Sequence, residues 1–287
     1  MSEDHHASDI HIDGFIPPEM AKRAESVGVS KANLGLQKMF LLAILAGAFI
    51  SLGAVFATTV SIGLNPFGFG IKKLLMGFVF SLGLILVVVA GGELFTGNNL
   101  IVMAWANKKI SSLKLIKNWT IVYIGNFVGA LLTAVLLILS KQYEFADGQM
   151  GQAILNIASA KLKYGFIQAI SLGILCNALV CLAVWLCFSA RTTTDKILSI
   201  LFPITAFVAC GFEHCVANMY FVPVALFLKW DASLSFWQSI GSQASEYSSL
   251  NWPAFLSSNL VPVTIGNIIG GSLLVGIIYW VIYIREK

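Results

Sequence analysis

Long apolar runs separated by short polar segments dominate the chain. They lie at roughly 38–62, 71–106, 117–140, 162–188, 197–229 and 253–283. Each is long enough to supply the about 20 apolar residues that a helix needs to cross a hydrocarbon core of about 30 Å. The pattern predicts an all-α, polytopic membrane protein with six transmembrane helices.

Composition and charge fit this prediction and add an orientation. Hydrophobic residues make up 57% of the chain and charged residues 11%, whereas soluble domains are about one-quarter charged. Of the 18 Lys and Arg residues, 12 lie in the N-terminal arm, in the loops after the second and fourth runs and in the tail. The positive-inside rule then places both termini in the cytoplasm. The net charge of +4 reflects this orientation, and we expect no nucleic-acid partner.

The runs divide the chain into a polar arm (1–35), a transmembrane domain (36–284) and a short tail (285–287). Because the arm lacks an apolar signal core, we expect no cleaved signal peptide. Pro17, Pro18 and Glu19 predict the start of a short amphipathic helix.

The histidines and cysteines give no metal pattern. His5, His6 and His11 precede the arm's predicted helix and are interpreted as a solvated tail. The cysteines fall inside predicted spans at spacings that match no zinc site, so we expect packing roles and no disulfide framework; they are Cys176, Cys181, Cys187, Cys210 and Cys215.

An internal repeat interrupts the second and fifth runs. GGELFTGN (91–98) and GFEHCVAN (211–218) both read G-x-E-x4-N, and the run after each contains I-G-N-x-x-G. The repeats, about 36–140 and 162–284, hold three crossings each, an odd number, so we predict an inverted 3+3 repeat. Broken helices at equivalent places predict a translocation site near the midplane, and half-helix N-termini there favour an anion.

A few polar side chains fall at the interruptions. Charge at this depth costs at least about 2.5–3.5 kcal/mol. Glu93 and Glu213 are equivalent, and we interpret them, with Asn98 and Asn218, as structural acceptors for exposed N–H groups; handling of substrate or a proton is the alternative. Leu94 occupies the position equivalent to His214. The unmatched His214 is therefore the best candidate for contacting an anion, as a hydrogen-bond donor or a cation.

The motifs GGELFTGN, KNWTIVYIGNFVGALL, GFEHCVANM and NLVPVTIGNIIGG resemble, in this order, the formate-nitrite transporter family, especially its formate channels. The resemblance runs from about Pro17 to Glu286. It implies aquaporin-like protomers in a homopentamer, each with its own formate pore. It further implies a bacterial inner (cytoplasmic) membrane location and pH-dependent permeation.

The resemblance also implies roles for single residues. Thr96 and Asn267 would hydrogen-bond around His214, and Lys161 would attract anions in an outer vestibule unless it is a snorkelling interfacial lysine. The arm resembles the family's mobile helix, implicated in gating and in docking pyruvate formate-lyase. Two apolar narrowings are implied, an outward one formed by Phe80, Leu84 and Phe207 and an inward one formed by Leu94, Phe95 and Val180.

Four alternatives stay open. A nitrite or hydrosulfide channel of the same family is the main one, because an imidazole with apolar rings discriminates weakly among small anions. An aquaporin-like solute channel lacks its paired Asn-Pro-Ala motifs here, and a bis-histidine haem enzyme lacks a second intramembrane histidine. A structural adaptor would not explain the broken, repeated helices. We therefore expect neither enzymatic activity nor a cofactor or metal.

Overall fold

The computed structural model describes residues 13–285, in which the chain is helical throughout and forms no strand. His5, His6, His11 and Glu286, which the sequence analysis discussed, lie outside the described residues. Five helical segments are long and apolar enough to cross a membrane; they are Leu36–Ser61, Phe69–Gly91, Ser112–Leu139, Phe166–Ser189 and Ala244–Tyr283. The prediction of an all-helical membrane protein is confirmed at this level.

Two helices are broken where the sequence is interrupted. The first, α3 (Phe69–Ile85), continues as a π-helix (Leu86–Gly91) and stops before a 3-10 turn (Gly97–Ile101) and α4 (Val102–Ala106). The second, α8 (Thr193–Ala209), stops before α9 (Cys215–Asp231). Each break leaves about five residues of non-helical backbone between two helical halves.

The other helices surround these broken ones. The long helices are α2 (Leu36–Ser61), α5 (Ser112–Leu139) and α7 (Phe166–Ser189). The last apolar segment joins α11 (Trp252–Ala254), α12 (Val261–Ile268) and α13 (Ile278–Tyr283) through π-helical stretches at Phe255–Leu260 and Ile269–Ile277. The short helices are α1 (Pro17–Ala32), α6 (Gln149–Lys161) and α10 (Leu234–Ser239), and 3-10 turns occupy Asn65–Phe67, Gln142–Glu144 and Ala244–Tyr247.

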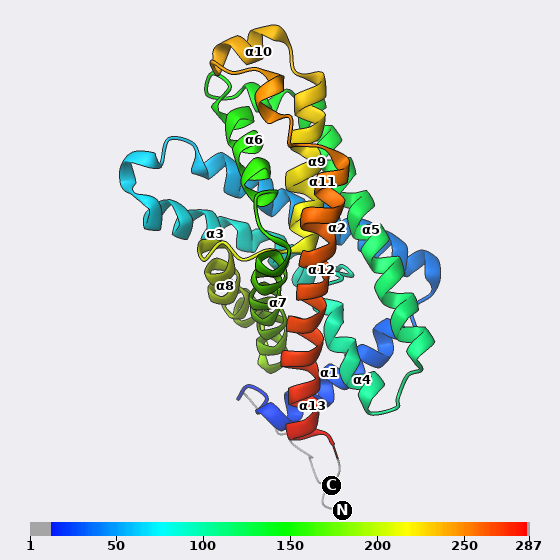
Figure 1. Cartoon of the computed structure of the whole chain (residues 1–287). Helices are drawn as coiled ribbons and strands as arrows, with labels where there is room; N and C mark the ends of the chain where they lie inside the picture. The colour runs from blue at the N-terminus through cyan, green and yellow to red at the C-terminus, as the bar shows by residue number, and fades with distance from the viewer. Residues whose placement is uncertain (1–12, 286–287) are drawn as a thin grey trace, which may run out of the picture.

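The helices α1 and α6 lie at opposite ends of the molecule. In Figure 1, α1 lies with α4 and α13 at one end, and α6 with α10 at the other. Two prolines occupy the first positions of α1, and Glu19 accepts a hydrogen bond from the N–H of Ile16 (3.2 Å), which caps the helix. The sequence analysis did not predict α6 as an element of its own.

A clasp holds the start of the arm against the loop between α7 and α8. The ring of Phe15 lies between two guanidinium groups, 4.3 Å from that of Arg23 and 3.7 Å from that of Arg191. Ser189 Oγ donates to the Phe15 carbonyl (2.8 Å), and Arg23 donates to the Phe188 carbonyl (2.9 Å). The arm is therefore held against the bundle by hydrogen bonds to backbone carbonyl groups and by cation–π contacts.

Large apolar side chains cover much of the outer surface. Leu136 is 66% exposed, Leu139 73% and Phe202 75%. An exposed apolar surface of this extent is unfavourable in water, which indicates that it contacts lipid or other protein.

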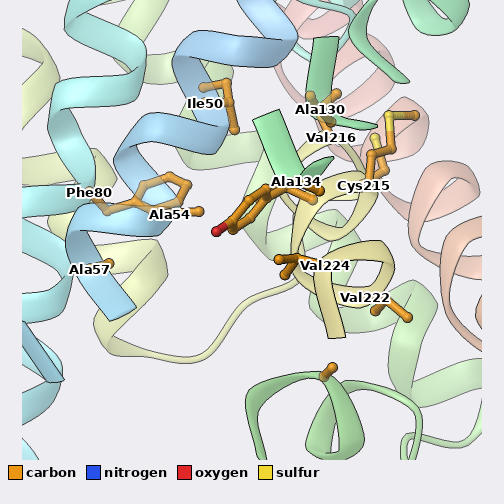
Figure 2. Packing of buried hydrophobic residues seen from close by; sticks show 14 of the residues in the cluster. Ile50, Ala54, Ala57, Phe80, Ala130, Ala134, Cys215, Val216, Val222 and Val224 are labelled. Atoms are coloured by element: carbon orange, nitrogen blue, oxygen red, sulfur yellow. The ribbon is translucent and has the colours of Figure 1, made fainter. Parts of the chain in front are cut away.

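Small residues let the long helices approach closely. A Cβ atom added to Gly129 of α5 would lie 2.0 Å from the Ile44 carbonyl oxygen of α2, and one added to Gly270 would lie 2.2 Å from the Ile174 carbonyl oxygen of α7. Figure 2 shows the same principle in the core, where short side chains of α2 and α5 such as Ala54 and Ala134 are buried. The glycines of the I-G-N-x-x-G motifs thus permit backbone contact between helices.

We predict that Gly129→Ala destabilises the protein. The methyl group would overlap the Ile44 carbonyl, and overpacking of this kind costs about 1–3 kcal/mol. The midpoint of thermal unfolding in detergent should fall measurably. Gly165→Ala is the matched control, because a Cβ atom there meets nothing within 4 Å. Equal midpoints for the two variants would contradict the close packing of α2 and α5.

Candidate functional site

One asparagine satisfies the backbone of the first break. Asn126 of α5 donates from Nδ2 to the carbonyls of Ala43 and Glu93 (both 2.8 Å) and accepts the N–H of Phe95 at Oδ1 (2.9 Å). An amide has two donor hydrogens, and both are used here. Asn126 therefore ties α2 to both sides of the break before α4.

A second asparagine repeats this arrangement at the other break. Asn267 donates to the carbonyls of Gly173 (2.8 Å) and Glu213 (2.9 Å) and accepts the N–H of Cys215 (2.9 Å). Asn126 and Asn267 are both fully buried. The expectation that an amide within a span has polar partners is fulfilled at both positions.

Each break also carries an ion pair, with a buried carboxylate, that is held by two further amides. Lys31 Nζ donates to Glu93 Oε1 (2.8 Å), and Asn98 Nδ2 donates to Glu93 Oε2 (2.7 Å) and to Asn118 Oδ1 (2.9 Å). Asn118 in turn donates to the Lys31 carbonyl (3.2 Å). The four side chains form a closed loop that links α1, the break and α5.

The second loop repeats these four bonds, although the further bond from Lys31 Nζ to Asn98 Oδ1 (2.9 Å) has no counterpart at Asn218. Lys161 Nζ donates to Glu213 Oε1 (2.8 Å), and Asn218 Nδ2 donates to Glu213 Oε2 (2.7 Å) and Asn259 Oδ1 (2.8 Å). Asn259 donates to the Lys161 carbonyl (3.0 Å). This pairing includes α6, which ends just before the long helix α7, as the first includes α1, which ends just before the long helix α2.

The carboxylates have different partners from those expected. Glu93 and Glu213 were expected to accept bonds from backbone N–H groups of the broken helices. They accept them from lysine and asparagine side chains instead, because Asn126 and Asn267 already bind the N–H groups at the breaks.

Two cavities approach the breaks from opposite sides. The α1 cavity, of about 420 Å³, is lined by α1 and by residues such as Leu84 and Leu94. The α6 cavity, of about 160 Å³, is lined by α6 and by Phe80, Phe207 and His214. The repeat-equivalent residues Leu94 and His214 therefore line different cavities.

His214 is buried and oriented by two hydrogen bonds. Its Nδ1 accepts the N–H of Ala217 (3.0 Å) and so caps α9, and its Nε2 lies 3.0 Å from Thr96 Oγ1. Because Nδ1 accepts, we assign a neutral imidazole with its hydrogen on Nε2. A cationic ring would lose the cap. Asn267 hydrogen-bonds around His214 through the backbone on either side of it: it donates to the Glu213 carbonyl and accepts the N–H of Cys215.

The segment between the cavities is short and apolar. Phe80 and Leu84 are one helical turn apart on α3, about 6 Å, yet they line different cavities. Leu84 was expected in the outward narrowing and lies with Leu94 on the α1 side. Phe207 meets Phe80 edge-on (5.6 Å between centroids) and stacks on His214 (5.9 Å).

Two of the expected narrowing residues line neither cavity. Phe95 lies against Tyr123, with ring centroids 4.9 Å apart, and Val180 is buried within α7.

The described residues match the formate/nitrite transporter family model over 18–281. The chain belongs to the formate/nitrite transporter family. It is 49% identical over 280 residues to the formate channel FocA of Escherichia coli strain K12, covering 98% of each chain. It is 42% identical over 261 residues to FocA of Haemophilus influenzae, covering 91% of this chain and 92% of the relative.

Solved structures of relatives agree with this assignment. A structure described as a pentameric formate channel with formate bound is 47% identical, with a TM-score of 0.83, and covers 87% of this chain and 98% of its own. A second, described as an FNT family ion channel, is 27% identical, with a TM-score of 0.78, and covers 92% and 98%.

In this family member, Tyr164 lies beside the second loop. It lines the α6 cavity near Glu213. Burial, reinforced by the negative charge of Glu213, raises the pKa of Tyr164 above its ordinary value, so its phenol stays neutral.

We predict that the Lys161–Glu213 pair is coupled. Lys161→Met leaves a carboxylate buried without its cation, which costs about 3–5 kcal/mol, whereas Lys161→Met with Glu213→Gln removes both charges and should cost less. The readout is the midpoint of SDS-induced unfolding in detergent. Lys163→Met, at an exposed position, is the control. A double variant less stable than the Lys161 single variant would refute the coupling.

Proposed function

We propose that the chain is a formate channel, with a nitrite or hydrosulfide channel as the second candidate. The relatives named as formate channels, which cover nearly its whole length, support formate. The observation that carries the proposal is the buried His214–Thr96 pair at the short segment between the two cavities. A donor in this place suits a small monovalent anion.

The proposal includes a topology of six crossings in an inverted repeat. Besides the five long apolar segments, the halves α8 and α9, of 17 residues each, would make the remaining crossing. The matching ion-pair loops, which join α1 at one end of the molecule and α6 at the other, support inversion. The lysine distribution predicts that both termini are cytoplasmic. The family resemblance implies that the membrane is the inner membrane of a bacterium.

The assembly is proposed to be a homopentamer with one pore per protomer. The pentameric description of the similar solved channel and the exposed apolar exterior support this. Docking of pyruvate formate-lyase at the arm stays a prediction from the family resemblance.

Charge determines how formate would cross. Placing a bare carboxylate in an apolar stretch of low dielectric costs tens of kcal/mol, whereas protonating an acid of pKa about 3.5 at pH 7 costs about 4–5 kcal/mol. We infer that formate crosses the segment between Phe80 and Leu84 together with a proton, which comes from solution and returns to solution on the other side.

His214 would assist this passage as a neutral donor. In our assignment Nε2–H bonds Thr96 Oγ1, so an arriving carboxylate can accept this hydrogen while Nδ1 keeps its cap on α9. A hydrogen bond to a charged group is worth about 1.5–3 kcal/mol. The bond would hold formate at the end of the α6 cavity until a proton arrives.

Flux assays distinguish the candidate substrates. Proteoliposomes should take up formate faster than protein-free vesicles and saturate with concentration. Nitrite or hydrosulfide uptake that saturates at lower concentration than formate would favour the second candidate. Free glycerol passage without formate uptake would reject both.

We predict that His214→Asn lowers formate flux at pH 7 about tenfold or more and changes its pH profile. Asparagine can still cap α9 through its side-chain oxygen but lacks the Nε2 donor, and the lost bond of about 1.5–3 kcal/mol corresponds to roughly tenfold to a hundredfold. Thr96→Val removes only the partner of the imidazole and should have a smaller effect. The measurement is stopped-flow uptake between pH 5 and pH 7. Asparagine and wild-type proteins with the same rates and profile would remove His214 from the pore.

A further inference from the structure

The charges that line the α6 cavity do not cancel. Lys73, Lys161 and Glu213 are its charged lining residues, while His214 and Tyr164 are neutral. Lys161 and Glu213 form an ion pair at 2.8 Å, and the Lys161 ammonium also lies 5.3 Å from the Phe221 ring. Seen from an approaching anion, this pair is a small dipole. The cavity therefore has one net positive charge.

That charge belongs to Lys73. Within residues 13–285 its ammonium makes no hydrogen bond and no ion pair, and the contact recorded for it is the Phe69 ring at 5.6 Å. Lys73 lies near the start of α3, is half-buried and lines the cavity that also contains His214. It lies at the wall of the cavity, and within residues 13–285 no carboxylate is paired with it.

We infer that Lys73 is the anion-collecting residue of the α6 cavity, where it would bind a small monovalent carboxylate before the anion reaches His214. This inference rests on the proposed function. It assigns to Lys73 the attraction of anions that the family resemblance implied for Lys161, because Lys161 forms an ion pair with Glu213.

The physical basis is focusing of the field by a narrow, low-dielectric wall. Phe80, Phe207, Phe212 and Phe221 line the same cavity, so little polar protein screens Lys73. An unpaired charge in such a cleft raises the local concentration of counter-ions and the association rate by at least about tenfold in favourable cases. On the α1 side, both Arg23 and Lys196 line the cavity besides the Lys31–Glu93 pair, so no single residue decides its charge.

The test compares formate influx into right-side-out and inverted membrane vesicles, which present opposite cavities to the medium. At about 0.01 M ionic strength, where the Debye length is about 30 Å, Lys73→Gln should slow influx roughly threefold to tenfold from one side only. Lys73→Arg should restore it. At about 1 M ionic strength, where the Debye length is about 3 Å, the Lys73 variants and the wild type should have the same formate influx. Lys163→Gln, at an exposed residue outside the cavity lining, is the control and should match wild type.

Two results would overturn the inference. One is Lys73→Gln influx equal to wild type from both sides at low salt. The other is a slowing that salt does not abolish, because that would indicate a structural role for the lysine.

A second measurement needs no flux and separates this inference from the proposed function. Acylation of lysine amines, followed by mass spectrometry, should modify Lys73 before Lys161, and formate at low ionic strength should slow the modification of Lys73. Modification of Lys73 that formate leaves unchanged would overturn the site. Wild-type vesicles without formate influx above protein-free ones would instead overturn the channel.

Discussion

The structure depends on satisfying backbone polar groups where two helices break. In hydrocarbon an unpaired N–H or C=O group costs several kcal/mol, so irregular backbone survives only where protein supplies its partners. Asn126 and Asn267 supply them, each with two donated bonds and one accepted bond. Without these amides the backbone groups that they bind would lose those partners, at a cost of several kcal/mol for each unsatisfied group.

The ion pairs follow from the same constraint. Glu93 and Glu213 lie within the breaks and are almost fully buried, so each needs a cation. Lys31 and Lys161 provide it from α1 and α6, which explains why these short helices lie over the two cavities. Removal of α1 or α6 would therefore leave a buried carboxylate uncompensated as well as opening a cavity.

The scaffold is duplicated, but the chemistry is not. His214 is equivalent to Leu94, and Thr96 is equivalent to Val216. The hydrogen bond between Thr96 and His214, which joins the two breaks, therefore has no second copy at the equivalent positions. Duplication supplies the frame of amides and ion pairs. The residues that differ between the two repeats distinguish the cavities: the α6 cavity ends at the hydrogen-bond donor His214, and the α1 cavity ends at Leu84 and Leu94. Lys73 adds a further difference, because it lines the smaller cavity and has no ion-pair partner among the residues that the structure describes.

Much of this arrangement could be predicted from sequence, because G-x-E-x4-N and I-G-N-x-x-G mark the breaks and their amides. The His214–Thr96 contact agrees with the family resemblance. The partners Lys31 and Lys161 have a sequence signal that the analysis missed, since each stands five residues before a long helix, at Leu36 and at Phe166. Which of the two cavities Leu84 lines could not be predicted. Phe80, one turn away on α3, lines the other cavity, and the position of each residue along the pore depends on tertiary packing.

The most direct test of the account is simultaneous recording of current and internal pH in proteoliposomes given a formate gradient at pH 7. If the apolar segment excludes bare anions, formate influx should acidify the interior by about one proton per formate, faster than in protein-free vesicles, with little current. A current that accounts for the whole formate flux, without acidification, would contradict the account and indicate passage of the unprotonated anion.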